Sequence, residues 1–337
     1  MDCMMRPGHI SPMKRRSLRF GLRTALAVLA AVSFALACCG YAYRGAVRQR
    51  EAVDYILATG NTVGYNTAVG DAPASESEPL WKELTRTVTA VSLDHQYVSA
   101  NDTLLAQHLG RLSGIEELYF YDFGGDYGEP VYDSTWKPLI NLRRLRSLSL
   151  PRAGMVGLIH DGCPLQELAI YNDPIDRQQA ERFAKFPLQT LRVLASDEAM
   201  PAIGTMGHLS DLDLSDSHLR DSSYAALGEL LNLEVLSLKS TGVGDEGLRW
   251  LNGLPKLKVL VLEDTETTDR AMAHLTTLKS LETLDLHRTR VSRVGLQKLP
   301  TLPTLKRVFL TRSSQLTAAD IDEFKRTRPD VKVTVGH

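Results

Sequence analysis

Cysteine is scarce in this sequence and lacks the spacing of a disulfide framework or a metal site. The chain has four cysteines: Cys3 lies in a basic leader, Cys38 and Cys39 lie in an apolar segment, and only Cys163 lies in the remaining body. A single thiol cannot form an internal disulfide, and no CxxC-type ligand spacing is present. Packing of apolar side chains must therefore stabilise the body.

Positive charge is also scarce where a nucleic-acid-binding protein would need it. Six of the 39 Lys and Arg residues and one of the 40 Asp and Glu residues lie in the first 43 positions, which leaves 33 bases and 39 acids for the body. A mildly acidic body lacks the basic face that attracts phosphates, which excludes DNA and RNA as partners. Apolar content of 43% excludes a disordered chain.

One apolar segment near the N-terminus is free of charge from Thr24 to Tyr43. A helix of this length spans about 30 Å, the thickness of the hydrocarbon core. Basic residues crowd its upstream side: Lys14, Arg15, Arg16, Arg19 and Arg23. This distribution predicts a basic cytoplasmic leader over residues 1–23, a single transmembrane anchor over 24–43 and an exported body in the periplasm or cell envelope. The competing hypothesis is a signal peptide cleaved after Ala35-Leu36-Ala37, which also exports the body.

The body repeats a short leucine pattern with a period of 24 residues. Units of the form LxxLxL begin at Leu209, Leu233, Leu257, Leu281 and Leu305. A small hydroxyl residue follows each start at a fixed distance: Ser217, Thr241, Thr265, Thr289 and Ser313. Less regular units begin at Val88, Ile115, Leu145, Leu165 and Leu188. Self-similarity of this kind indicates a repeat protein, with about ten repeats and a C-terminal cap over residues 88–337.

The chemistry of one unit predicts its structure. Alternate residues of LxL face one side of a short strand, and the hydroxyl residue can bond the backbone where the chain turns. Asp221, Asp245 and Asp269 stand just before the next apolar run, where N-caps of short helices are expected. One unit cannot bury both faces, so neighbours must stack. The expected fold is an α/β solenoid with a curved parallel sheet and short helices on its convex side.

Both ends of the array have segments that can cover it. We expect residues 44–87 to form a juxtamembrane helix, a strand at Thr62–Tyr65 and a loop at Gly70–Pro79. At the other end, a helix is expected over Asp320–Arg326 and a closing strand over Val331–Val335. A solenoid needs such covers because an open sheet edge can pair with other chains.

The repeat pattern LxxLxLxxTxVxDxGLxxLxxL resembles the ribonuclease-inhibitor-like and cysteine-containing-like class of leucine-rich repeat over Val88 to His337. The basic leader, the single anchor and the following segment Gln49 to Val53 are similar to membrane-anchored repeat proteins of planctomycete-type bacteria. The resemblance implies architecture more than activity. The sequence departs from the pattern where Arg293 replaces the expected capping Asp and in the irregular early units.

Aromatic residues on the early strands form one candidate binding surface. Tyr119, Tyr121 and Tyr171 occupy outward positions, and the insertion from Asp122 to Trp136 adds further aromatic side chains, including Trp136 itself. Exposed aromatics on a rigid concave sheet are typical anchors of protein interfaces. The alternative is that the insertion folds its aromatics onto its own rim.

Acidic residues on the later strands form a second candidate surface. Asp211, Asp213, Asp216, Glu263 and Asp285 follow outward positions, and His287 lies beside them. Such a track would prefer a basic partner, or would be no more than a solvated face. Glu263, Asp285 and His287 also raise the alternative of a metal site or an enzyme.

No cofactor is expected. Residues 242–247 match GxGxxG, yet the same slot of the next repeat has no glycine and the 24-residue spacing between strands is too short for a dinucleotide-binding unit. We therefore expect a non-enzymatic, membrane-anchored scaffold that binds a protein through its concave face. The alternatives are an envelope receptor for a glycan or another ligand, and an intracellular substrate adaptor of a ubiquitin-ligase-like system.

Overall fold

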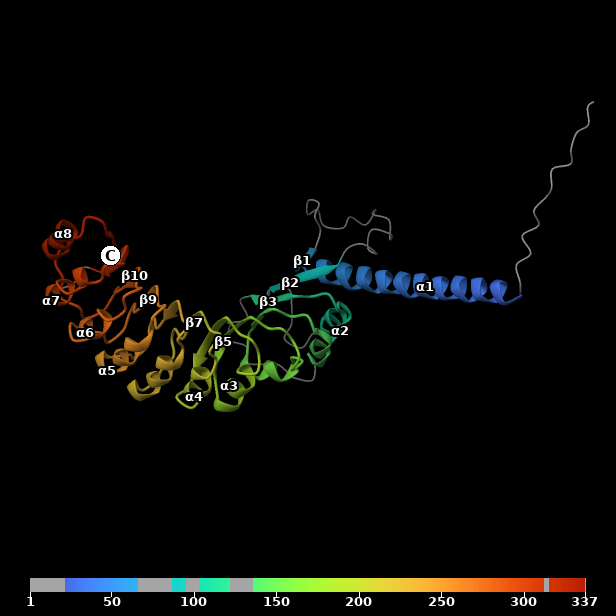
Figure 1. The fold of residues 1–337 in the computed structure, drawn as a ribbon, viewed down its shortest axis with the longest axis horizontal. Coiled ribbons are helices and arrows are strands. Elements are labelled where there is room, and N and C mark those ends of the chain that lie inside the picture. The colour runs from blue at the N-terminus through green and yellow to red at the C-terminus, as the bar shows by residue number, and fades with distance from the viewer. Residues whose placement is uncertain (1–21, 66–86, 95–102, 122–135, 312–314, 337) are drawn as a thin grey trace, which may run out of the picture.

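The computed structural model describes residues 22–65, 87–94, 103–121, 136–311 and 315–336 (Figure 1). The N-terminal part contains α1 (Leu22–Ala58), β1 (Thr62–Tyr65), β2 (Val88–Asp94), α2 (Thr103–Arg111), β3 (Glu117–Tyr121), η2 (Lys137–Asn141), β4 (Ser147–Leu150) and η3 (Ala153–Leu158). The predicted loop at Gly70–Pro79 and residues 122–135 of the predicted insertion lie outside the described residues.

The remaining elements alternate between short strands and short helices. They are β5 (Glu167–Ile175), α3 (Arg177–Phe183), β6 (Thr190–Ala195), α4 (Met200–Gly204), β7 (Asp211–Asp213), η4 (Asp221–Glu229), β8 (Val235–Ser237), α5 (Asp245–Leu248), η5 (Arg249–Gly253), β9 (Val259–Val261), α6 (Met272–Leu275), β10 (Thr283–Asp285), α7 (Arg293–Leu296), η6 (Leu299–Thr301), β11 (Arg307–Thr311), α8 (Ala318–Thr327) and β12 (Lys332–Gly336).

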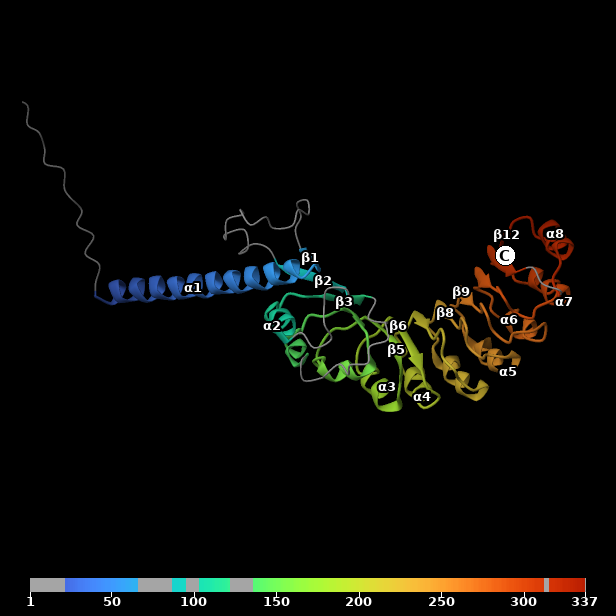
Figure 2. The same cartoon turned by 180° about the vertical axis from the view of Figure 1, so that it is seen from behind.

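All described strands belong to one curved sheet. Its 12 strands are paired in the order of the chain, and every pair is parallel except β1 with β2. The sheet lines the concave side of the arc and the helices α3 to α7 lie on the convex side (Figures 1 and 2). This is the leucine-rich-repeat solenoid that the period of the sequence predicts.

The central leucines of the repeats form the predicted ladder. Leu212 pairs in register with Leu236, Leu236 with Leu260, and Leu260 with Leu284. The same register continues through the less regular early units, from Val91 to Leu191. Each of these four central leucines is fully buried. One core therefore runs through the array, because each leucine packs against the same position of the next repeat.

The hydroxyl residues bond the backbone at the turns, as expected. Thr241, Thr265 and Thr289 each donate to the carbonyl oxygen three residues earlier, at 2.7, 2.8 and 2.9 Å. Ser217 instead accepts the backbone N–H of Ala195 in the preceding repeat at 2.9 Å. Ser313 lies outside the described residues.

The prediction that the repeated aspartates Asp221, Asp245 and Asp269 cap their own helices is wrong. Gly244 occupies the N-cap position of α5 and makes no side-chain cap bond. Asp245 instead accepts hydrogen bonds from the next repeat: from the backbone N–H groups of Thr268 (2.9 Å) and Ala271 (3.2 Å), and from the Thr268 hydroxyl (2.6 Å). Because the carboxylate reaches forward by one repeat, it joins two neighbouring units.

The helix α1 is continuous across the boundary expected at Tyr43. Its exposed apolar side chains include Val32, Phe34 and Leu36, whereas further along the helix Ala52, Val53 and Ile56 are buried in the core of the solenoid. By length and composition the stretch Ala30–Ala58 could cross a membrane or serve as a signal sequence. The first half of α1 therefore projects from the body while its last turns form part of the N-terminal cap (Figure 1).

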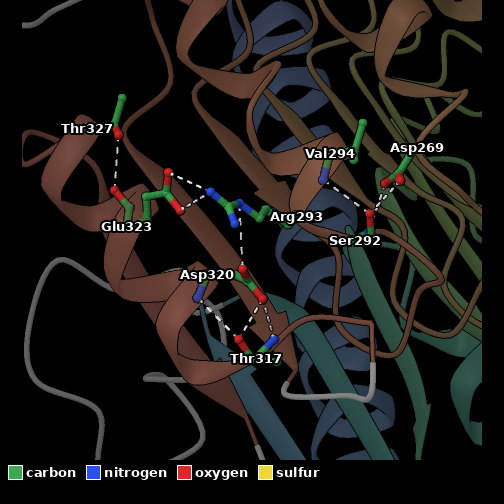
Figure 3. Close-up of polar contacts among 8 residues, drawn as sticks. All are labelled: Asp269, Ser292, Arg293, Val294, Thr317, Asp320, Glu323 and Thr327. Carbon is green, nitrogen blue, oxygen red and sulfur yellow. Dashed lines mark hydrogen bonds and ion pairs between the residues drawn. The ribbon is translucent and has the colours of Figure 1, made fainter.

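The two edges of the sheet are formed by elements that differ from the repeats. The strand β1 pairs with β2 in the antiparallel sense at the N-terminal edge. At the C-terminal end, α8 buries Ile321 and Phe324, and β12 pairs in parallel with β11. The side chain of Thr317 caps α8 in a reciprocal arrangement with Asp320 (Figure 3). A strand at each end of the sheet and a helix before β12 thus form at the expected residues, and their role as caps stays a prediction.

Candidate functional site

A hollow on the concave face of β3 to β7 is lined mainly by polar side chains. Its volume is about 310 Å³, and its lining includes Tyr119, Ser147, Glu167, Tyr171, Arg192 and Asp211. The register of the parallel strands brings these residues together: Ser147 pairs with Glu167, Thr190 with Asp211, and Ala169 with Arg192. Residues up to 92 positions apart in the sequence therefore line one surface.

A chain of hydrogen bonds crosses this hollow. The Tyr119 hydroxyl donates to Ser147 Oγ at 3.0 Å, and Ser147 Oγ donates to Glu167 Oε2 at 2.9 Å. Burial raises the pKa of the Tyr119 phenol, so the hydroxyl keeps its proton and its role as donor at neutral pH. Glu167 is thus held at a fixed place on the surface while its carboxylate stays accessible.

The hollow combines an exposed aromatic side chain with both signs of charge. Tyr171 is 54% exposed although it extends from β5, one of the longest strands of the sheet. Arg192 is exposed on β6, and Asp211 is partly buried on β7. An exposed aromatic side chain beside two carboxylates is suited to binding a partner with an apolar portion and a basic group.

No protein-family model and no curated protein matches this chain. Solved structures of internalins from Listeria monocytogenes are similar to it. For the internalin inlF, the TM-score is 0.47 with 16% identity over 68% of this chain and 70% of that chain. For internalin C2 (inlC2), the TM-score is 0.40 with 20% identity over 59% of this chain and 83% of that chain. The solenoid architecture stands on the strand register and does not depend on this likeness.

The structure divides the predicted aromatic surface. Tyr119 and Tyr171 line the hollow, and the side chain of Tyr121 lies outside the described residues. The expectation that Trp136 is an exposed anchor is wrong, because it is only 1% exposed and its ring meets that of Phe120 edge-on at 5.2 Å. Trp136 directly precedes η2, so its large apolar ring fills the core between the third strand and that helix.

Most side chains of the predicted acidic track on the later strands form hydrogen bonds or ion pairs with neighbouring residues of the solenoid. Asp213 accepts from the backbone N–H of Ser215 at 2.9 Å, and Lys239 Nζ lies 2.9 Å from Glu263 Oε2. His287 Nδ1 lies 3.0 Å from Asp285 Oδ1, and the His287 ring packs against Phe309. Within the described ranges, no group of three or more His, Cys, Asp or Glu residues is placed to hold a metal ion.

Sequence reasoning missed three residues of the hollow: Ser147, Glu167 and Arg192. All three occupy outward positions of predicted strands, so the alternation of the pattern already placed them on the concave face. What the pattern lacked was a reason to prefer them over other polar residues. That reason comes from the hydrogen bonds across neighbouring strands and from their common place around one hollow.

Asp211 carries a charge that weakens the fold. Burial raises the pKa of its carboxyl group, Asp213 raises it further, and Arg192 acts in the opposite direction. A raised pKa in the folded state means that folding favours the protonated form, so the charged form costs stability at neutral pH. Perturbed charges of this kind are typical of functional surfaces.

We therefore expect Asp211→Asn to be more stable than the wild type at neutral pH. The gain in the free energy of unfolding should shrink as the pH falls. It should vanish below about pH 4, where the Asp211 carboxyl is protonated in the unfolded chain as well. Urea unfolding at several pH values measures this difference. Glu229→Gln, at the exposed carboxylate that ends η4, is the matched control. If the two variants gained the same stability at every pH, the charge of Asp211 would not be the source of the effect.

Proposed function

We propose that this protein is a membrane-anchored, non-enzymatic scaffold of the cell envelope that binds a protein partner in the concave hollow of β3 to β7. The observation that carries the proposal is the fixed row of Tyr119, Ser147 and Glu167 beside the exposed Tyr171. The side chains are held in place before any partner arrives, which lowers the entropy cost of binding.

The chemistry of the hollow favours a partner segment with a basic side chain next to an apolar one. Glu167 and Asp211 supply negative charge, and Tyr171 supplies an exposed ring. Arg192, on the strand between them, can pair with a carboxylate or a backbone carbonyl of the same partner. Protein interfaces combine aromatic anchors with charge pairs in this way.

The proposed location rests on α1. Its uncharged stretch from Thr24 to Tyr43 exposes Val32, Phe34 and Leu36, which is unfavourable in water and favourable in a bilayer. The basic residues before this segment favour a cytoplasmic N-terminus and an exported solenoid. An alkaline phosphatase fused after His337 should be active in cells. An inactive fusion would favour the intracellular adaptor instead.

A photo-crosslinker tests the binding surface directly. We expect benzoylphenylalanine in place of Tyr171 to give a discrete adduct in native membranes, because this side chain lies at the rim of the hollow. The same substitution at Trp250, on the convex side and 36% exposed, is the matched control. Adding Glu167→Gln and Asp211→Asn should reduce the yield at position 171.

The outcomes separate the candidates. A protein adduct specific to position 171 supports the proposal, and a glycan adduct there supports an envelope receptor of another class. Equal yields at positions 171 and 250 would mean that the hollow is not the binding surface.

A further inference from the structure

A large groove lies away from the concave hollow, beside the point where α1 joins the solenoid. Its volume is about 830 Å³. One wall is the α1 segment around Tyr41, Gly45 and Arg48, and the other consists of the turns after α2 and η2. The two walls are brought together because the last turns of α1 pack into the core while its first half projects outward (Figures 1 and 2).

The charge of this groove is opposite to that of the body. Its described lining contains four arginines, Arg48, Arg111, Arg143 and Arg144, and no Asp or Glu. All four are exposed, and none of them forms an ion pair with a carboxylate in the described part of the chain. Most other arginines of the repeat region have an acidic neighbour, as Arg146 has Glu116. Unpaired guanidinium groups facing one groove indicate an anionic ligand.

The groove lies at the depth of lipid head groups if α1 is a membrane anchor. The uncharged run ends at Tyr43, and the α1 residues that line the groove extend from Tyr41 to Gln49. These eight steps along a helix cover about 12 Å, which spans the polar layer of a bilayer and the first water beyond it. Arg48 Nε donates to the carbonyl of Arg44 at 3.3 Å, so its side chain runs back along α1 toward the apolar half.

We propose that this groove binds the phosphate head groups of anionic phospholipids in the membrane that holds α1. The inference rests on the proposed membrane anchoring and adds a second contact to it. Guanidinium groups bind phosphate oxygens through paired hydrogen bonds, and each basic residue near an anionic surface adds to membrane affinity. With α1 and the groove both engaged, the solenoid is held in one orientation, which keeps the concave hollow away from the bilayer.

The test uses the full-length chain in detergent, incubated with equal amounts of phosphatidylglycerol and phosphatidylcholine and analysed by native mass spectrometry. The wild type should retain phosphatidylglycerol in preference. Arg143→Gln with Arg144→Gln should lower the ratio of the two retained lipids by about tenfold or more, since each arginine contributes roughly fivefold. Both side chains are exposed and lie outside α1, so the variant keeps its fold and its anchor.

The matched control is Arg270→Gln with Arg326→Gln, two exposed arginines at the far end of the solenoid, which should leave the ratio unchanged. Equal retention of the two lipids by the wild type, or an unchanged ratio in the groove variant, would overturn the inference. Complete displacement of phosphatidylglycerol by excess inorganic phosphate would also overturn it, because the groove would then select phosphate and not a lipid. Alkaline extraction of cell membranes tests the membrane anchor independently of the groove. If the protein resists extraction but shows no lipid preference, the proposed anchor stands and only the proposed lipid site in the groove is rejected.

Discussion

Leu260→Ala is expected to lower the free energy of unfolding by about 3 kcal/mol, the largest effect of any single substitution considered for this protein. Leu260 is fully buried and pairs in register with Leu236 on one side and Leu284 on the other. Truncation leaves a cavity shared by three repeats. A solenoid cannot close such a cavity by shifting one unit, because each unit is held by both neighbours.

Denaturant titration of the full chain in detergent, followed by far-ultraviolet circular dichroism, measures this loss. The matched control is Leu231→Ala, the same substitution at a leucine that is 55% exposed, for which a change of less than about 0.5 kcal/mol is expected. If the two variants lost similar stability, the continuous core would not be the source of the stability of the array.

The sequence alone was enough to predict the solenoid because its repeats are so regular. From Leu209 onward, the spacing of 24 residues places each apolar side chain at the same point of a common turn. The prediction extended to the irregular early units, since an inward leucine or valine is retained at each strand centre even where the connections differ in length. Val91 and Leu118 pair in register despite a separation of 27 residues.

Contacts between repeats were harder to predict than the repeats themselves. The aspartate before each helix has the spacing of an N-cap, and periodicity cannot tell whether its carboxylate bonds its own helix or the next one. The glycine of the DxGL motif resolves the question in hindsight. A Cβ at Gly295 would lie 2.5 Å from Asp269 Oδ1, so a small residue is needed for the aspartate of the preceding repeat to reach this backbone.

The candidate site was predicted only in outline. Tyr119 and Tyr171 were placed on the concave face by alternation, and that placement holds. Trp136 was wrongly predicted to be exposed, because it follows an insertion and lies outside the repeat pattern. The pattern therefore does not indicate whether its side chain faces the core or the solvent. The joining of Tyr119, Ser147 and Glu167 depends on side-chain geometry across three strands, which a pattern of residue types does not contain.

Arg293 marks the place where the series of forward-reaching aspartates ends. It occupies the aspartate slot of the last regular helix, and the cap helix α8 that follows presents acidic groups instead of free backbone N–H groups. Arg293 Nη2 lies 2.9 Å from Glu323 Oε2, and its Nε lies 3.8 Å from Asp320 Oδ1 (Figure 3). The reversal of charge at this slot thus matches the change from a repeat to a cap, and the departure from the pattern has a structural reason.

Asp269→Ala is expected to lower the free energy of unfolding by about 2 kcal/mol and to loosen α7 in particular. Asp269 accepts three hydrogen bonds from the next repeat. Two come from Ser292, from its backbone N at 2.8 Å and its Oγ at 2.6 Å (Figure 3), and the third comes from Gly295 N at 3.0 Å. Without the carboxylate, two backbone N–H groups at the start of α7 lose their acceptor. If the loss appears as easier local opening of α7, the backbone amides of Ser292 and Gly295 should exchange about thirtyfold faster.

Hydrogen exchange of the full chain, read by mass spectrometry over peptides that contain α7, measures this effect. Glu266→Ala is the matched control, since Glu266 pairs with Arg290 at an exposed position where an ion pair contributes at most about 1 kcal/mol. Asp269→Asn should recover part of the loss, because its amide oxygen can still accept from Ser292 N and Gly295 N without the strength of a charged acceptor. Exchange in α7 that is the same in Asp269→Ala and the wild type would show that the forward-reaching aspartate does not join the repeats, and the cohesion of the array would then rest on its leucine ladder alone.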